Sequence, residues 1–251
     1  YNVGVRFNYG TLSSTAGNIT ITGTAGTGYG YGSTHNTGVV VGQYGTISSS
    51  GTGIEITGYG TTDTNATTDS HGVDIRGTVQ ATNAANVDIT GFGGQGTDFN
   101  HGVSTSSSSN VSAADGDITI DGTANTATTG QENRGISAEG EIKSTGTGAV
   151  SLTGTGGSGT NFNDGVATLY GNSISTVDGS VTIAGTANTL TTGQNNRGIS
   201  TEGAIATSDG AVSLTGTGGG GTDQNEGVKI LVVDLGDGYT GDSISTVNGA
   251  I

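Results

Sequence analysis

The sequence contains no proline, cysteine, methionine or tryptophan, and only 11% of its 251 residues are charged. Without cysteine the chain has no disulfides and no thiolate metal ligands. The absence of proline suits a chain in which every strand must donate backbone hydrogen bonds to its neighbours. No apolar run approaches the length of about 18 residues that a transmembrane helix needs, so we expect no membrane insertion.

Basic residues are also scarce. Lys and Arg total 6 against 21 Asp and Glu, which gives a formal net charge of -15. The basic residues are dispersed along the chain, and phosphate binding needs clustered Lys or Arg. We therefore expect no nucleic acid partner. The acidic balance is compatible with a secreted or surface protein and with cation binding.

Small residues dominate what is present, with 51 glycines and many Ser, Thr and Asn. This composition could describe a disordered linker. The apolar residues, however, stand at regular intervals, and most of them are Val, Ile or Leu, of which the β-branched members favour strands. The pattern therefore indicates a folded β structure.

Three motifs recur in fixed order, once every 31 to 35 residues. The first is an apolar-x-apolar-x-Gly strand that begins at Ile19, Ile54, Val87, Ile118, Val150, Val181 and Val212. The second is a glycine followed by Val or Ile, found at Gly4, Gly38, Gly72, Gly102, Gly135, Gly165, Gly198 and Gly227. The third is one apolar residue among small polar ones, at Leu12, Ile47, Val79, Val111, Ile142, Ile174, Ile205 and Ile244.

Three short strands per repeat predict an all-β fold, a right-handed parallel β-helix. This three-sided β-solenoid would have about seven coils of 31 to 35 residues, each strand stacked about 4.8 Å from its equivalent. We expect Gly and Asn to supply the positive-φ corners between the faces. Residues 1–251 would form a single solenoid segment that is truncated within a coil at both ends.

One interval breaks the regular spacing. From the second-motif glycine to the third-motif apolar residue the distance alternates between 9 and 7 residues along most of the chain, but from Gly227 to Ile244 it is 17. We therefore expect an inserted loop at 229–242 in the last coil. Its acids Asp234, Asp237 and Asp242 are weak candidates for binding calcium. A protruding hairpin with solvated acids explains them equally well.

One column of equivalent positions is rich in asparagine. Stacked asparagines can hydrogen-bond amide to amide along a solenoid axis, so we expect a structural ladder here. Its members are Asn2, Asn36, Asn100, Asn133, Asn163, Asn196 and Asn225, with Ser70 at the remaining coil.

The next column alternates in charge. Arg134, Asp164, Arg197 and Glu226 stand in it in that order, which predicts a charge ladder of weak surface ion pairs that hold the coils in register. Earlier in the same column stand His71 and His101. Two neighbouring imidazoles could share a metal ion, and a purely structural role is the competing interpretation.

Other features that resemble functional motifs are weaker. Segments 93–98 and 218–223 match the start of the calcium-binding pattern GGxGxD, but the copies lie coils apart and turn composition explains them. The paired acids Asp115 and Asp117 could share one face. Acids recur at that corner, however, and no catalytic sequence motif is present. We expect no enzyme activity and no cofactor, with calcium the one alternative.

The repeated sequence patterns GxITITGTGG, NxGVxI and GxIxSTGTG resemble the repeats of very large secreted bacterial proteins. These are the filamentous-haemagglutinin-like adhesins and related β-strand-repeat surface proteins. The resemblance covers residues 3–251 and implies an extracellular stalk, fibre or adhesin shaft. It carries over no catalytic residues, because that family has no common catalytic set.

The leading hypothesis is a structural rod at the cell surface or outside the cell. Such a rod would self-associate end to end or laterally into a fibre, or continue into a longer chain. The first alternative is a glycan- or host-binding adhesin module that acts through 229–242 or through the aromatic residues Tyr29, Tyr31 and Tyr59. A carbohydrate-active enzyme is a further, weaker alternative.

Overall fold

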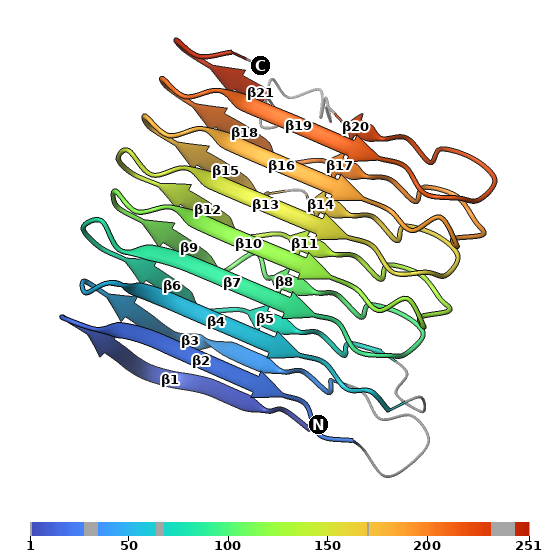
Figure 1. Cartoon of the computed structure of the whole chain (residues 1–251), viewed down its shortest axis with the longest axis horizontal. Helices are drawn as coiled ribbons and strands as arrows, with labels where there is room; N and C mark the ends of the chain where they lie inside the picture. The colour runs from blue at the N-terminus through green and yellow to red at the C-terminus, as the bar shows by residue number, and fades with distance from the viewer. Residues whose placement is uncertain (1, 28–34, 64–67, 170, 232–243, 251) are drawn as a thin grey trace.

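The computed structural model describes residues 2–27, 35–63, 68–169, 171–231 and 244–250, and these form a parallel β-solenoid of about seven turns (Figure 1). All strand pairs in the two sheets of these ranges are parallel, and no helix occurs in them. In particular, this part of the chain has no helix with the length and apolarity required to cross a membrane. The predicted fold class is confirmed, and the right-handed winding stays a prediction.

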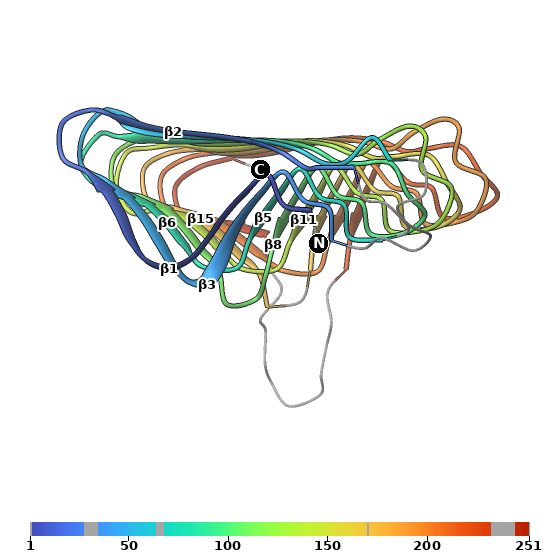
Figure 2. The same ribbon diagram turned by 90° about the horizontal axis from the view of Figure 1, so that it is seen from below.

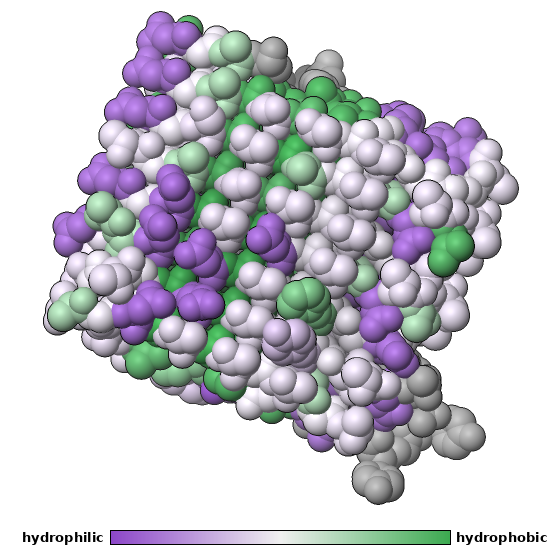
Figure 3. All heavy atoms as spheres, viewed as in Figure 1, coloured by the Kyte–Doolittle hydropathy of each residue, from purple (hydrophilic) through white to green (hydrophobic). Residues whose placement is uncertain are grey.

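The first motif forms a flat seven-stranded layer that faces the viewer in Figure 1. Its strands are β2 (Asn18–Thr24), β4 (Gly53–Tyr59), β7 (Asn86–Phe92), β10 (Ile118–Thr123), β13 (Val150–Thr155), β16 (Val181–Thr186) and β19 (Val212–Thr217). Figure 3 shows rows of weakly polar residues over this face, with strips of hydrophobic residues visible between the rows. The alternation follows from the two-residue period of a strand, which points every second side chain inward.

The second and third motifs share a 14-stranded sheet that closes the other two sides of the coil (Figure 2). In the first two turns one long strand covers both motifs: β1 (Val5–Ser14) and β3 (Val39–Ser49). The later second-motif strands are β5 (Val73–Ile75), β8 (Val103–Thr105), β11 (Ile136–Ala138), β14 (Val166–Thr168), β17 (Ile199–Thr201) and β20 (Val228–Ile230). The later third-motif strands are β6 (Thr78–Ala81), β9 (Asn110–Ala113), β12 (Glu141–Ser144), β15 (Ser173–Thr176), β18 (Ala204–Thr207) and β21 (Ile244–Thr246).

The register between turns is the one that the three motifs predict. In the first stack, Ile118 pairs with Val87 on one side and with Val150 on the other. The second and third stacks follow the same rule, as in the pairings of Ile136 with Val166 and of Ile142 with Ile174. A slip of one residue would turn every core side chain of a strand outward, so the buried columns fix the register.

Glycines allow the two sheets to approach where each first-motif strand ends. A Cβ atom added to Gly122 would lie 2.1 Å from the carbonyl oxygen of Gly135, far inside van der Waals contact. The equivalent glycines of the other turns meet in the same way. The contact divides each turn into an apolar triangle of three strands and a polar lobe that lies beyond the glycines.

The connections between the second and third stacks alternate in length. Two residues separate Ile75 from Thr78 and Ala138 from Glu141, whereas four separate Thr105 from Asn110. In the two following turns, four residues separate Thr168 from Ser173 and two separate Thr201 from Ala204. Neighbouring turns are therefore of two kinds.

Candidate functional site

The asparagine column runs through the polar lobe as a chain of buried hydrogen bonds. Oδ1 of Asn133 accepts from both the backbone N and Nδ2 of Asn100, at 3.0 and 2.9 Å. Asn133 donates in the same two ways to Oδ1 of Asn163, which donates in turn to Asn196. Between Asn100 and Asn196 these side chains are 0% exposed, so the ladder replaces hydration that the lobe excludes.

The ladder has two hydrogen bonds at its first step and a backbone bond alone at its last. Both nitrogens of Asn2 donate to Oδ1 of Asn36, and the backbone N of Asn196 donates to Oδ1 of Asn225 at 2.8 Å. Ser70 interrupts the column. Its backbone N donates to Oδ1 of Asn100, but its buried hydroxyl has no hydrogen bond among the described residues.

A left-handed residue precedes the ladder position in each of these turns. The expectation that Gly and Asn would form the corners is wrong here, because most of these residues are larger. They are His35, Asp69, Phe99, Glu132, Phe162, Asn195 and Gln224, with φ between 52° and 60°. In most of these turns the backbone N–H of the next residue donates to an asparagine Oδ1 of the following turn, which holds the chain just after the left-handed residue.

The charge column lies in the interior rather than at the surface, which corrects the expectation of exposed ion pairs. Arg134 is 7% exposed, Asp164 1% and Arg197 6%, and only Glu226 at the end is half-buried. Nε of Arg134 lies 3.7 Å from Oδ2 of Asp164, and Nε of Arg197 lies 3.1 Å from Oε2 of Glu226. Buried pairs of this kind hold their partners firmly, because loss of one charge leaves the other without compensation.

Backbone contacts make this column a second ladder. The N–H of Arg197 donates to Oδ1 of Asp164, and the N–H of Arg134 donates to Nδ1 of His101. The N–H of His101 donates in turn to Nδ1 of His71. The side chains of His71, His101 and Asp164 therefore each cap a backbone N–H of the following turn.

The two histidines stack with ring centroids 4.9 Å apart and planes 6° from parallel. Burial is the main cause that lowers the pKa of both imidazoles, and it places that of His101 well below 6.5. Nδ1 of each ring already accepts a backbone hydrogen bond, so a shared metal ion could use only the Nε2 atoms. Within the described ranges, no three His, Asp or Glu side chains cluster as metal ligands.

The acids considered for calcium or catalysis also bind backbone where the structure describes them. Oδ1 of Asp98, in the first GGxGxD-like segment, accepts from the N–H of Gln131 at 2.8 Å. Oδ1 of Asp117 accepts from the N–H of Ala149 at 2.8 Å. These carboxylates join successive turns. The calcium candidates Asp234, Asp237 and Asp242 lie outside the described residues.

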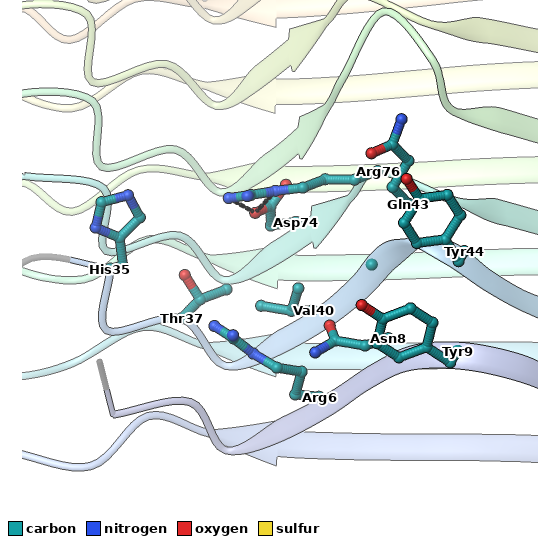
Figure 4. Close-up of a pocket in the computed structure, with 11 residues that line it drawn as sticks. Arg6, Asn8, Tyr9, His35, Thr37, Val40, Gln43, Tyr44, Asp74 and Arg76 are labelled. Carbon is teal, nitrogen blue, oxygen red and sulfur yellow. Dashed lines mark hydrogen bonds and ion pairs between the residues drawn. The ribbon is translucent and has the colours of Figure 1, made fainter.

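A groove of 370 Å³ crosses the first three turns on the side of the second stack (Figure 4). Three residues form a column across it: Arg6, Val40 and Asp74 are paired in register on β1, β3 and β5. Val40 is 5% exposed although it occupies an outward-facing position, and it forms an apolar floor. Nε and Nη2 of Arg76 hold Oδ2 of Asp74 at 2.7 and 2.6 Å.

One wall of the groove is a pair of exposed tyrosines (Figure 4). The rings of Tyr9 and Tyr44 stack with centroids 5.6 Å apart and planes 10° from parallel, and they are 73% and 66% exposed. Asn8 and Gln43 line the groove beside them. Of the aromatics singled out in the sequence, Tyr59 stacks instead on Phe92 over the flat sheet, whereas Tyr29 and Tyr31 lie outside the described residues.

A local irregularity builds this groove. Between Phe7 and Tyr9 the register of β1 against β3 shifts, because β3 carries one extra residue at 42–43. A Cβ atom on Gly42 would lie 2.5 Å from Oδ1 and 2.9 Å from the Cα atom of Asn8, so a larger residue here would force the two strands to shift. The sequence signal that could have found the site is Val39-Val-Val41, where an unbroken apolar run replaces the usual alternation.

A small cavity of 140 Å³ lies on the same side further along the axis and belongs to the charge column. Glu132, Arg134, Asp164 and Arg197 line it. Nη2 of Arg134 lies 3.0 Å from Oε2 of Glu132, and Nη1 of Arg134 donates to Oγ of Ser137. The charged side chains that line this cavity are therefore already paired within the protein.

Comparisons with models of protein families, with curated proteins and with solved structures found no match to this chain.

Proposed function

We propose that the chain is part of a structural rod: the shaft of an extracellular or cell-surface filament, matrix fibre or adhesin. The observation that carries the proposal is the use of repeated polar positions for contacts between turns. The asparagine ladder and the charge column both bond each turn to the next, in addition to the strand ladders. The polar side chains of these two columns are engaged in contacts between turns.

The physical consequence is stiffness along the axis. From the turn of Asn100 to the turn of Asn196, force along the rod acts on three columns of backbone hydrogen bonds and on the buried asparagine bonds in parallel. These turns cannot separate without breaking those bonds together. The resemblance of the repeats to filamentous-haemagglutinin-like and β-strand-repeat bacterial surface proteins supports the same role. We further propose that the chain is not an enzyme.

Electron microscopy of the native material tests the rod. Filaments whose axis carries a repeat of about 4.8 Å support it and distinguish one continuous solenoid from subunits stacked end to end or packed laterally. Discrete, monodisperse particles contradict it.

The alternative of a glycan- or host-binding module at 229–242 remains a hypothesis, since residues 232–243 lie outside the described part of the chain. Deletion of 232–242 would test it. Loss of glycan-array binding with an unchanged β-sheet circular dichroism spectrum would support this version, and unchanged binding would refute it.

A further inference from the structure

We infer that the groove across β1, β3 and β5 is a binding site for a saccharide, independent of the rod function and built from other residues than 229–242. Its volume of 370 Å³ falls within the range of about 300–1,000 Å³ typical of small-ligand sites. The lining combines aromatic rings, an apolar floor and planar polar groups. A pyranose ring has the matching chemistry, because it carries hydroxyls around its edge and C–H groups on its faces.

The tyrosine pair supplies the contact for the C–H face. Tyr9 and Tyr44 are the two most exposed aromatic side chains among the described residues. Burying such rings against a ligand removes a large apolar area from water, while their hydroxyls keep a polar contact. Their stacking on each other holds both in place before any ligand arrives, which lowers the entropy lost on binding. Val40 offers a second apolar contact at the floor.

The polar groups suit hydroxyls better than an isolated ion. The carboxylate of Asp74 is 5% exposed and its Oδ2 is held by two nitrogens of Arg76, so an acceptor group and a donor group lie side by side. A pair of neighbouring hydroxyls can donate to the first and accept from the second. The amides of Asn8 and Gln43 each add a donor and an acceptor.

The backbone irregularity points to the same place. Among the strand pairs of the described ranges, only β1 with β3 shows a register shift, and the groove lies over that shift. Bulges typically redirect side chains at functional sites. Here the bulge brings Gln43 and Tyr44 beside Asn8 and Tyr9, whereas the later turns keep a regular ladder.

The test uses the full 251-residue chain on an array of oligosaccharides with three arms: neutral hexoses, N-acetylhexosamines and uronic acids. Calorimetry then gives the dissociation constant of the best ligand. We expect Tyr44→Ala to weaken binding about tenfold, as truncation of an aromatic contact does. Gln43→Ala, at another exposed residue of the groove, should weaken it as well.

Tyr59→Ala is the matched control, because Tyr59 also stacks on an aromatic partner but lies on the flat sheet away from the groove. It should leave the dissociation constant unchanged. Nitration of the wild-type chain gives an independent readout: bound saccharide should protect Tyr9 and Tyr44 but not Tyr59. Failure of all three arms to bind, or equal losses in Tyr44→Ala and Tyr59→Ala, overturns the inference and leaves the rod proposal unaffected.

Discussion

The backbone N–H of Arg197 donates a hydrogen bond of 2.8 Å to Oδ1 of Asp164, one turn earlier in the solenoid. The other carboxylate oxygen faces Nε of Arg134 from the turn before. Asp164 therefore ties three successive turns together from a position that is 1% exposed. Burial nevertheless raises its pKa from 3.8 to about 6, against the opposing effects of Arg134 and Arg197.

This shift predicts an unusual pH dependence at Asp164. Between pH 3.8 and about 6 the folded chain holds a proton there that the unfolded chain has released. The contribution of Asp164 to stability is therefore complete below pH 3.8 and is lost as the pH rises through about 6, by about 3 kcal/mol in total. Relative to Asp164→Asn, the wild type should gain stability as the pH falls from 7 to 4. Urea denaturation of both chains at several pH values measures this, and a difference that stays constant with pH would contradict it.

His101 predicts a dependence of the opposite sign. Because burial holds the pKa of His101 well below 6.5, the unfolded chain takes up the proton first as the pH falls, and the fold loses stability below pH 6.5. His101→Asn keeps an oxygen that can accept from the N–H of Arg134, as Asp164 does for Arg197. We expect this variant to lose less stability between pH 7 and 5 than the wild type. Melting temperatures that fall equally in both chains would contradict the prediction.

Removing one member of the asparagine ladder should cost much more than removing an asparagine beside it. Asn163→Ala deletes the acceptor of two buried donors on Asn133 and the donor to Asn196. We expect a loss of about 3 kcal/mol in the free energy of unfolding. Asn161→Ala is the matched control: its Oδ1 accepts one exposed bond from Gln194, and its loss should stay below about 1 kcal/mol. Denaturant titrations measure both variants. Equal losses in the free energy of unfolding would show that the ladder adds no stability beyond that of an exposed asparagine.

The interruption at Ser70 predicts a stabilising substitution. In Ser70→Asn the new Nδ2 can donate to Oδ1 of Asn100, as Nδ2 of Asn100 does to Asn133, and the unpaired buried hydroxyl disappears. We expect the free energy of unfolding to rise by about 1 kcal/mol. Ser70→Ala separates the two effects, since it removes the hydroxyl without adding the amide. A melting temperature of Ser70→Asn at or below that of Ser70→Ala would refute the ladder explanation.

The sequence predicts the pairing of turns because one physical rule controls it. Each column of Val, Ile or Leu must point inward, and the glycine after each first-motif strand marks where the sheets meet. Those two constraints are enough to place Ile118 beside Val87 and Val150. Alignment of the polar columns follows from the same register, which is why the asparagines stand in hydrogen-bonding distance.

The spacing of the sequence repeat predicts neither the burial of the charge column nor the position of the groove. Arg134 is covered because Glu132 and Ser137 of its own turn and Asp164 of the next engage it, and a one-dimensional spacing does not show that enclosure. The groove collects residues from three turns whose individual composition matches ordinary surface. The one sequence feature that could have indicated the groove is Val40, an apolar residue at an outward-facing position.

The alternation of short and long connections doubles the axial period of the surface. Backbone strands repeat every turn, at about 4.8 Å, but identical connections at the junction of the second and third stacks recur only every second turn, at about 9.6 Å. A fibre built from such turns would therefore give a weak meridional diffraction order at half the frequency of the strand reflection. A partner molecule bound along this edge would meet equivalent connections at every second turn. Two such partners offset by one turn would contact connections of different length and sequence.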